Sequence, residues 1–112
     1  MGAGEPQGTS IMADFIFLMH EAAPADPAAW EAYLGRLSER GVLRGGSAIG
    51  RGFCLKKDGP APPISSHIVG YLRIEVDDMA AAQGLLAGNP VFEAGGVIEV
   101  RELPKGLGPA PD

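Results

Sequence analysis

Two histidines carry the side chains best suited to proton transfer in this sequence. His20 ends an apolar run and His67 opens an alternating one, so we expect both at strand ends, where side chains reach the rim of a cleft. A histidine titrates near neutral pH and can serve as a general acid or base. An ordinary hydrogen-bonded position at the protein rim explains each of them as well, and the sequence leaves both interpretations open.

Three further polar residues are candidates for holding a ligand. Tyr71 and Arg73 alternate along the segment SHIVGYLRIEV (66–76) and could bind an acidic or phenolic group from one face of a sheet. Cross-strand packing and an Arg–Glu pair explain them equally well. Asn89 precedes a proline in the segment GNPVFEAGGVIEV (88–100). Its amide could face a cleft or could bond to its own turn, which is the commoner role of asparagine.

We expect no metal and no cofactor. Two histidines without a cluster of carboxylates or thiolates fall short of the three protein ligands that a zinc site usually needs. The glycine-rich segment GGSAIGRG (45–52) lacks the lysine and the following helix of a phosphate-binding loop, which favours a bent strand. Cys54 is the single cysteine, and we expect it as unreactive packing within that strand.

Length and composition limit the class of protein. A chain of 112 residues suits one domain with one core. Its net charge of −5 disfavours a nucleic acid, whose phosphates need clustered lysine and arginine. A single cysteine fits a reducing compartment, and no apolar run approaches the ~20 residues that span a bilayer. We therefore expect a cytoplasmic protein that binds neither nucleic acid nor membrane.

The apolar residues recur with a period that changes several times between two and about 3.6, which predicts a β-α-β-β-α-β order. This is the ferredoxin-like arrangement of the α+β class, with both helices on one face of an antiparallel sheet. The expected elements are a strand at 13–21, a helix at 25–41, a glycine-broken strand at 42–57, a strand at 66–76, a helix at 77–88 and a strand at 96–103. We expect one domain at 13–104, between flexible tails at 1–12 and 105–112.

Local signals fix the ends of the helices. Asp26 is the expected N-cap of the first helix, Pro27 its first residue and Gly41 its stop. An aspartate cap and Gly88 delimit the second helix. The apolar stripes predicted to face the core are Trp30, Tyr33, Leu34 and Leu37 on the first helix, and Met79, Ala82, Leu85 and Leu86 on the second. Phe92 is expected to fill the space beneath the sheet before the last strand.

No helix is expected on the other face of the sheet. The charged residues predicted there are Arg73, Glu75, Glu99 and Arg101, together with one apolar face of the first strand. Such a face can be half wetted but not left bare. We expect a second copy to cover it, giving a homodimeric α+β barrel, with water and rim charges as the alternative.

The chain resembles the YCII-related proteins, which include the DGPF group, from about Ala13 to Leu103. The resemblance rests on the segments FIFLMHE, LSERGVLRGGSAIG, GYLRIEVDDMAAA and NPVFEAGGVIEV, and it implies a ferredoxin-like dimer. In the relatives best described, a histidine on the first helix and the aspartate of an Asp-Pro pair are the suspected catalytic pair. Trp30 and Asn89 stand in those two places here. Ala61 stands in the phenylalanine place of the DGPF loop, within KDGPAPP (56–62).

Two functions remain open from the sequence. The first is a small-molecule-binding protein without catalysis, which the loss of the His–Asp pair favours. The second is a cofactor-independent enzyme that acts on a small polar or aromatic metabolite in a cleft between helix and sheet. In that enzyme His20 or His67 is the acid or base, and Arg73 or Asn89 orients the substrate. Convergence of these four residues on one pocket would favour the enzyme.

Overall fold

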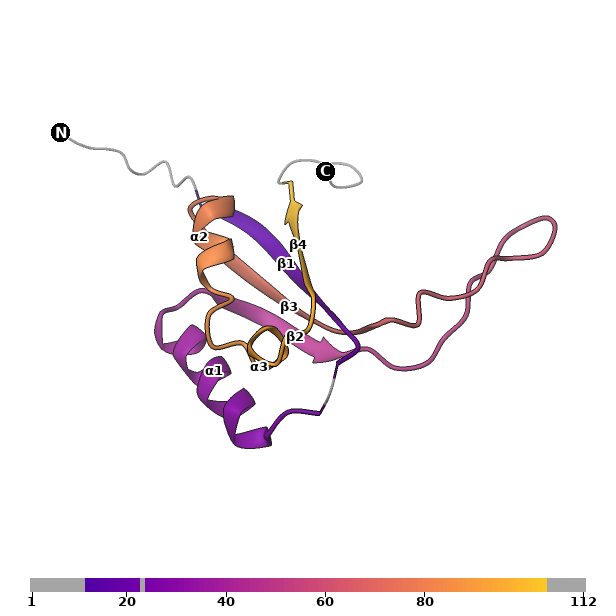
Figure 1. The fold of residues 1–112 in the computed structure, drawn as a ribbon. Coiled ribbons are helices and arrows are strands. Elements are labelled where there is room, and N and C mark those ends of the chain that lie inside the picture. The colour runs from indigo at the N-terminus through magenta and orange to yellow at the C-terminus, as the bar shows by residue number, and fades with distance from the viewer. Residues whose placement is uncertain (1–11, 23, 105–112) are drawn as a thin grey trace.

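The computed structural model describes residues 12–22 and 24–104. Its elements, shown in Figure 1, are β1 (Ala13–His20), α1 (Pro27–Glu39), β2 (Leu43–Ala48), β3 (Ile68–Val76), α2 (Met79–Gly84), α3 (Pro90–Glu93) and β4 (Ile98–Leu103). The tails expected at 1–12 and 105–112 lie outside the described residues, except for Met12. Within the described part, no helix is long and apolar enough to cross a membrane.

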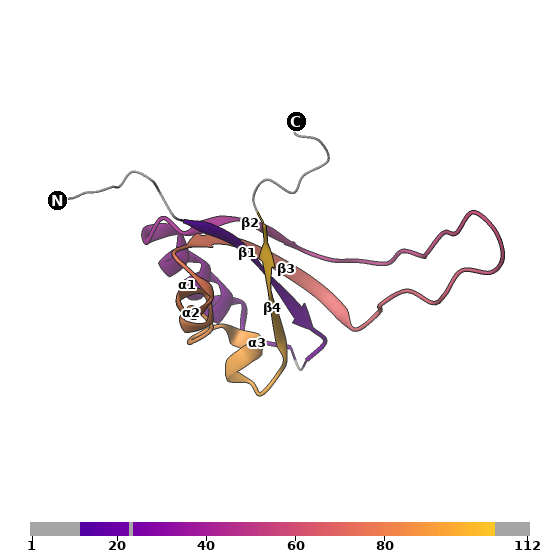
Figure 2. The ribbon, with the colours of Figure 1, turned by 90° about the horizontal axis from the view of Figure 1, so that it is seen from above.

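The four strands form one antiparallel sheet in the order β2-β3-β1-β4. β1 is central, and its Phe17 lies opposite Leu72 of β3 on one side and Val100 of β4 on the other. Figure 2 shows that the helices lie together on one side of this sheet. The predicted α+β class with an antiparallel sheet is therefore confirmed.

The core lies between the sheet and the helices. Alternate residues of a strand point to one face, and in β1 these are Phe15, Phe17 and Met19, all buried. Other members of the core are Tyr33, Leu37, Val42, Leu72, Ile74, Val76, Ala82, Leu85 and Val91. Phe17 and Ile74 are completely buried at 0% exposure. The alternation predicted for the segment 66–76 is thus confirmed in β3, where buried residues alternate with exposed or half-buried ones.

Helix α1 follows its predicted signals closely. The Asp26 side chain accepts a hydrogen bond from the Ala28 amide at 3.0 Å, and Pro27 occupies the first turn, where its missing N–H costs nothing. After the helix, Gly41 adopts a positive φ of 73°, a conformation that glycine adopts readily. The buried Tyr33 hydroxyl donates to the Leu85 carbonyl at 2.8 Å, and burial raises the pKa of Tyr33. This bond ties α1 to the end of α2.

The strand predicted at 42–57 is much shorter in the structure. It pairs with β3 from Leu43 to Ala48, with the predicted irregularity between Leu43 and Gly45. Residues 49–67 instead form a long extension, which we call the arm. Its glycines pack no side chains and its prolines lack an amide donor, so a ladder does not continue through it. Cys54 accordingly lies half-buried in the arm and not within a strand.

The helix predicted at 77–88 is also interrupted. α2 ends at Gly84, and a second short helix, α3, begins at Pro90 after a turn in which Gly88 has a φ of 88°. The expected inward positions of Met79 and Phe92 are wrong, because these side chains are 37% and 45% exposed. Val91 faces the core instead, and a Cβ at Gly96 would lie only 2.7 Å from its Cγ1.

No described helix covers the opposite face of the sheet, which we call the open face (Figure 2). The strand register places Ile16 of β1 there, between Arg73 of β3 and Arg101 of β4. Glu75 forms an ion pair with Arg44, with Nε and Oε1 3.0 Å apart. The face therefore combines half-buried apolar side chains of β1 with charged side chains of its neighbours. The other members from these three strands are Asp14, Leu18, His20, Val69, Tyr71, Glu99 and Leu103.

Candidate functional site

A cavity of about 510 Å³ is lined by α1 and by the part of the sheet formed by β2 and β3, with residues of both strand parities such as Leu72 and Tyr71. Ligand pockets commonly measure about 300–1,000 Å³, so its volume suits a small metabolite. His20, Ser47 and Tyr71 are the lining residues with polar side chains. The apolar walls are Met19, Ala22, Pro24, Ala25, Trp30, Leu34, Leu43, Ala48, Val69, Leu72 and Val91.

Glycines shape the wall of the cavity along β2. A Cβ at Gly46 would lie 2.6 Å from both Cδ2 of Leu72 and the Tyr71 carbonyl oxygen, a separation that real Cβ atoms do not tolerate. A Cβ at Gly70, on β3, would lie 3.3 Å from Cε of Met19. The glycines of β2, in the segment predicted to be a bent strand, thus allow the backbone of β2 to lie close to the backbone of β3 beside the cavity.

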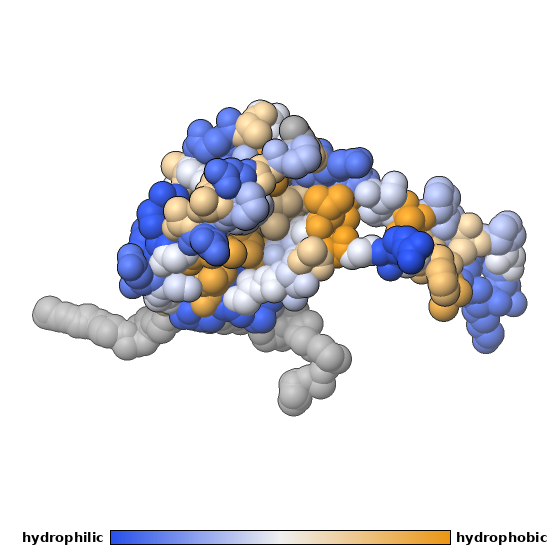
Figure 3. Space-filling view, turned by 90° about the horizontal axis from the view of Figure 1, so that it is seen from below, coloured by the Kyte–Doolittle hydropathy of each residue, from blue (hydrophilic) through white to orange (hydrophobic). Residues whose placement is uncertain are grey.

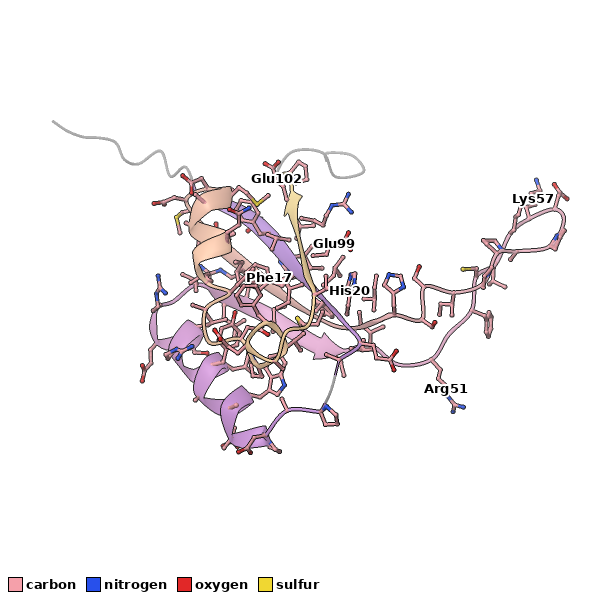
Figure 4. All side chains as sticks on the ribbon, viewed as in Figure 1. Phe17, His20, Arg51, Lys57, Glu99 and Glu102 are labelled. Carbon is pink, nitrogen blue, oxygen red and sulfur yellow. The ribbon has the colours of Figure 1, made fainter. Side chains whose placement is uncertain are left out.

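His20 belongs to a group of polar side chains at the end of β1, which we call the histidine cluster (His20, His67 and Glu99). Nε2 of His20 lies 3.2 Å from Oε1 of Glu99, and Figure 4 shows the two side chains beside β1 and β4. The His67 ring meets the His20 ring edge-on, with centroids 4.8 Å apart and planes at 81°. The other Glu99 oxygen, Oε2, accepts from Nη1 of Arg101 at 3.0 Å.

The strand register brings the cluster together. His20 is the last residue of β1, and its amide donates to the Val97 carbonyl at 3.0 Å, just before β4. Glu99 lies opposite Leu18, so it is a diagonal neighbour of His20 on the same face of the sheet. His67 sits at the base of the arm, where its carbonyl accepts from the Glu21 amide at 2.7 Å. Backbone bonds therefore anchor both histidines.

The charges of this cluster favour the carboxylate form of Glu99. The hydrogen bond with His20 lowers the pKa of Glu99 most, and the bond from Arg101 lowers it further. A carboxylate bonded to one imidazole nitrogen fixes the ring orientation, and the other nitrogen can then exchange a proton with a ligand. The arrangement is therefore a histidine–carboxylate pair at the edge of a cavity.

Removal of the His20 ring should raise the pKa of Glu99 toward its ordinary value of 4.5. We expect His20→Ala to move it further than Arg101→Ala, because the His20 bond is the larger cause. Carboxyl ¹³C NMR titration measures the pKa of Glu99 in each variant. Arg51→Gln, on the arm, is the control and should leave the pKa of Glu99 unchanged. Because the pKa is depressed in the folded state, the stabilisation is present above pH 4.5 and disappears as pH falls through the folded value. A larger shift in Arg101→Ala would contradict the assignment.

Of the other predicted site residues, Tyr71 shares the cavity with His20, and Arg73 and Asn89 do not. Tyr71 lines the cavity, whereas Arg73 lies exposed on the open face and does not line it. Asn89 is completely buried at 0% exposure. Its Oδ1 accepts from the amides of Val91 at 2.9 Å and Phe92 at 3.2 Å. The side chain of Asn89 therefore has the commoner role, in which the amide bonds to the backbone of its own turn. It has no exposed surface at which to bind a ligand.

Glu99 is the member of the cluster that sequence reasoning missed. The sequence pattern places Glu99 on the charged side of the last strand and does not indicate His20 as its neighbour. The signal available was the strand order itself, since a fourth strand beside the first brings its glutamate next to the residue that ends β1. Trp30 and Leu34 were expected in the core, and both also line the cavity.

Among residues 12–22 and 24–104, no group of three or more histidines, cysteines or carboxylates is arranged to hold a metal ion. A scan against models of protein families and a search of curated proteins both found no match to this chain.

Proposed function

We propose that the protein binds a small, mainly apolar or aromatic molecule in the cavity beneath α1. The observation that carries this proposal is the cavity itself, about 510 Å³ in volume, with Trp30 and Leu34 on its helix side and His20 and Tyr71 among its few polar residues. An apolar pocket with a few placed polar groups is the usual form of a metabolite site. The apolar walls would hold the ring or chain of the ligand, and the polar groups would orient it.

The chain is further proposed to be a YCII-related protein with a ferredoxin-like fold, a cytoplasmic homodimer in which two sheets pack face to face. The strand order β2-β3-β1-β4 supports the fold. The half-buried apolar side chains Ile16 and Leu18 on the open face support the dimer, because a second copy would remove them from water. The use of one cysteine supports a reducing compartment.

A second candidate function, a cofactor-independent enzyme, is favoured by the 3.2 Å contact between His20 and Glu99. Glu99 would stabilise the imidazolium that forms when His20 takes a proton from the ligand. Once any turnover is found, His20→Gln should lower its rate by about 10²-fold or more. His67→Gln should be compared separately, because its ring touches His20 and could serve instead. An unchanged rate in both variants would exclude the acid–base mechanism.

The single tryptophan, Trp30, reports directly on the cavity. We expect 8-anilinonaphthalene-1-sulfonate, an apolar aromatic anion, to bind there and quench the fluorescence of Trp30 by energy transfer. Ala48→Phe places a ring at the wall of the cavity and should weaken this binding at least about tenfold. The matched control is Ala32→Phe, on the exposed side of α1. Equal affinities in the two variants would mean that the probe binds elsewhere, and the cavity proposal would then fail.

A further inference from the structure

The arm packs little against the core of its own chain. Figure 1 shows it leaving the ends of β2 and β3 as two extended limbs joined by a turn. From residue 50 to residue 63, no backbone hydrogen bond joins it to another described segment. The two limbs meet at Cys54, whose Sγ donates to the Pro63 carbonyl at 3.6 Å. The arm's own contacts do not offset the entropy of ordering it.

Large apolar side chains on the arm face water. Phe53 is 78% exposed and Leu55 is 84% exposed. Ile64, on the other limb, is 40% exposed and lies beside Gly52, whose Cβ would be 3.3 Å from its Cδ1. Grouped apolar side chains on a surface mark an interaction site more often than scattered ones do.

The arm also has a direction. In Figure 2 the helices lie on one side of the sheet, and the arm bends toward the other side, that of the open face. Figure 3 shows the hook-shaped outline that results, with hydrophobic side chains where the arm joins the rest of the molecule. The open face and the arm thus form one concave surface.

We propose that the arm of each copy clasps a second copy of this chain that packs on the open face, an inference that rests on the proposed homodimer. A two-fold pair is closed, so a single interface would cover both open faces and both arms. Each limb has roughly nine residues and extends roughly 30 Å, while four strands span only about 15 Å. The arm is therefore long enough to pass the edge of the partner's sheet.

Charge supports the same partner. The arm carries Arg51, Lys56 and Lys57 against Asp58, whereas the whole chain has a net charge of −5. The arm therefore has a net charge of +2 and the rest of the chain a net charge of −7, so a second copy attracts the arm electrostatically. Arg51 and Lys57 project from the arm in Figure 4, while Glu99 lies on the sheet. Salt should accordingly weaken the association.

Sedimentation velocity across a dilution series tests the clasp. We expect the wild type to dimerise, and the double variant Phe53→Ser with Leu55→Ser to raise the dimer Kd about 100-fold, because four apolar anchors are lost per dimer. Phe92→Ser, at a side chain 45% exposed on α3 on the helix side of the sheet (Figure 2), is the control and should change the Kd little. Circular dichroism should show an intact fold in both variants, since the replaced side chains are exposed.

The measured Kd values distinguish failure of the arm contact from failure of the homodimer. A wild-type dimer with an unchanged Kd in the double variant overturns the clasp and leaves the homodimer standing. A wild type that is monomeric at about 100 μM overturns both. Binding of the fluorescent probe in the cavity is measured separately and judges the small-molecule proposal by itself.

A crosslink locates the contact. With p-benzoylphenylalanine in place of Phe53, illumination of mixed ¹⁴N and ¹⁵N copies should yield mixed-isotope pairs, joined from the arm of one copy to the other. A dimer in which the crosslinks form only within one chain, or do not form, overturns the proposal. The same experiment at 1 M salt should give fewer pairs.

Discussion

Phe17→Ala should lower the free energy of unfolding by about 3–5 kcal/mol, the cost of removing a phenyl ring from a packed core. Phe17 is completely buried at 0% exposure, and its strand neighbours are Leu72 and Val100 on either side. The space left by the ring lies in the middle of the sheet, where backbone bonds on both sides limit collapse. Since domains of this size have about 5–15 kcal/mol in total, much of the stability would be lost. Urea unfolding followed by circular dichroism measures the change.

Phe92→Ala is the matched control for that experiment. The Phe92 ring is 45% exposed on α3, so its removal exposes little new surface and should cost less than about 1.5 kcal/mol. The sequence-based expectation placed Phe92 beneath the sheet and would give the two variants similar costs. If Phe92→Ala lowered the free energy of unfolding as much as Phe17→Ala, or more, the exposed position described for Phe92 on α3 would be contradicted.

Asn89→Ala should cost about 2 kcal/mol, at the upper end of the range for helix caps. The Oδ1 atom of Asn89 accepts two backbone hydrogen bonds in a site that water does not reach. Alanine would leave both donors without that acceptor. Asp78→Ala, which removes the exposed cap of α2, is the control and should cost less, because water replaces its bond to the amide of Ala81. Equal costs would contradict the importance of burial at Asn89.

Asn89→Asp separates capping from charge at the same position. A carboxylate keeps the two bonds from the amides, but burial disfavours its charged form and raises its pKa above the ordinary value of about 3.9. Stability should then be close to that of the wild type below about pH 4 and should fall as pH rises toward neutrality. Urea unfolding at pH 4 and pH 7 measures the difference. A variant equally stable at both values would mean that water reaches residue 89.

The elements set by short-range patterns were predictable from the sequence. The cap at Asp26, the stop at Gly41 and the alternation along β3 each depend on residues within a few positions of one another. The arm was not predictable in this way, because GGSAIGRGFCLKK places apolar residues among its glycines and so favours a glycine-broken strand. A segment becomes a paired strand only when another strand lies beside it. Because β3 begins only at Ile68, residues 50–57 have no strand of the sheet with which to form backbone hydrogen bonds.

The candidate site was predictable only in part. His20 at the end of β1 followed from the apolar run before it, but its contact with Glu99 joins residues 79 positions apart. Such a contact depends on strand order and register, and neither is visible in a local pattern. The burial of Asn89 likewise depends on the direction in which α3 leaves the turn at Gly88. Gly88 and Pro90 set that direction, and the amino-acid composition does not reveal it.

The central position of β1 has a consequence for synthesis on the ribosome. β1 is made first among the strands, yet its second edge pairs with β4, from Asp14 opposite Leu103 to Met19 opposite Ile98. At about 5–20 residues per second, translation of residues 77–97 adds roughly 1–4 s after β3 is complete. During that interval the paired strands β1 and β3 leave the second edge of β1 unpaired, and an unpaired strand edge can pair with another nascent chain. The second edge of β1 can therefore pair only once the last strand has been made.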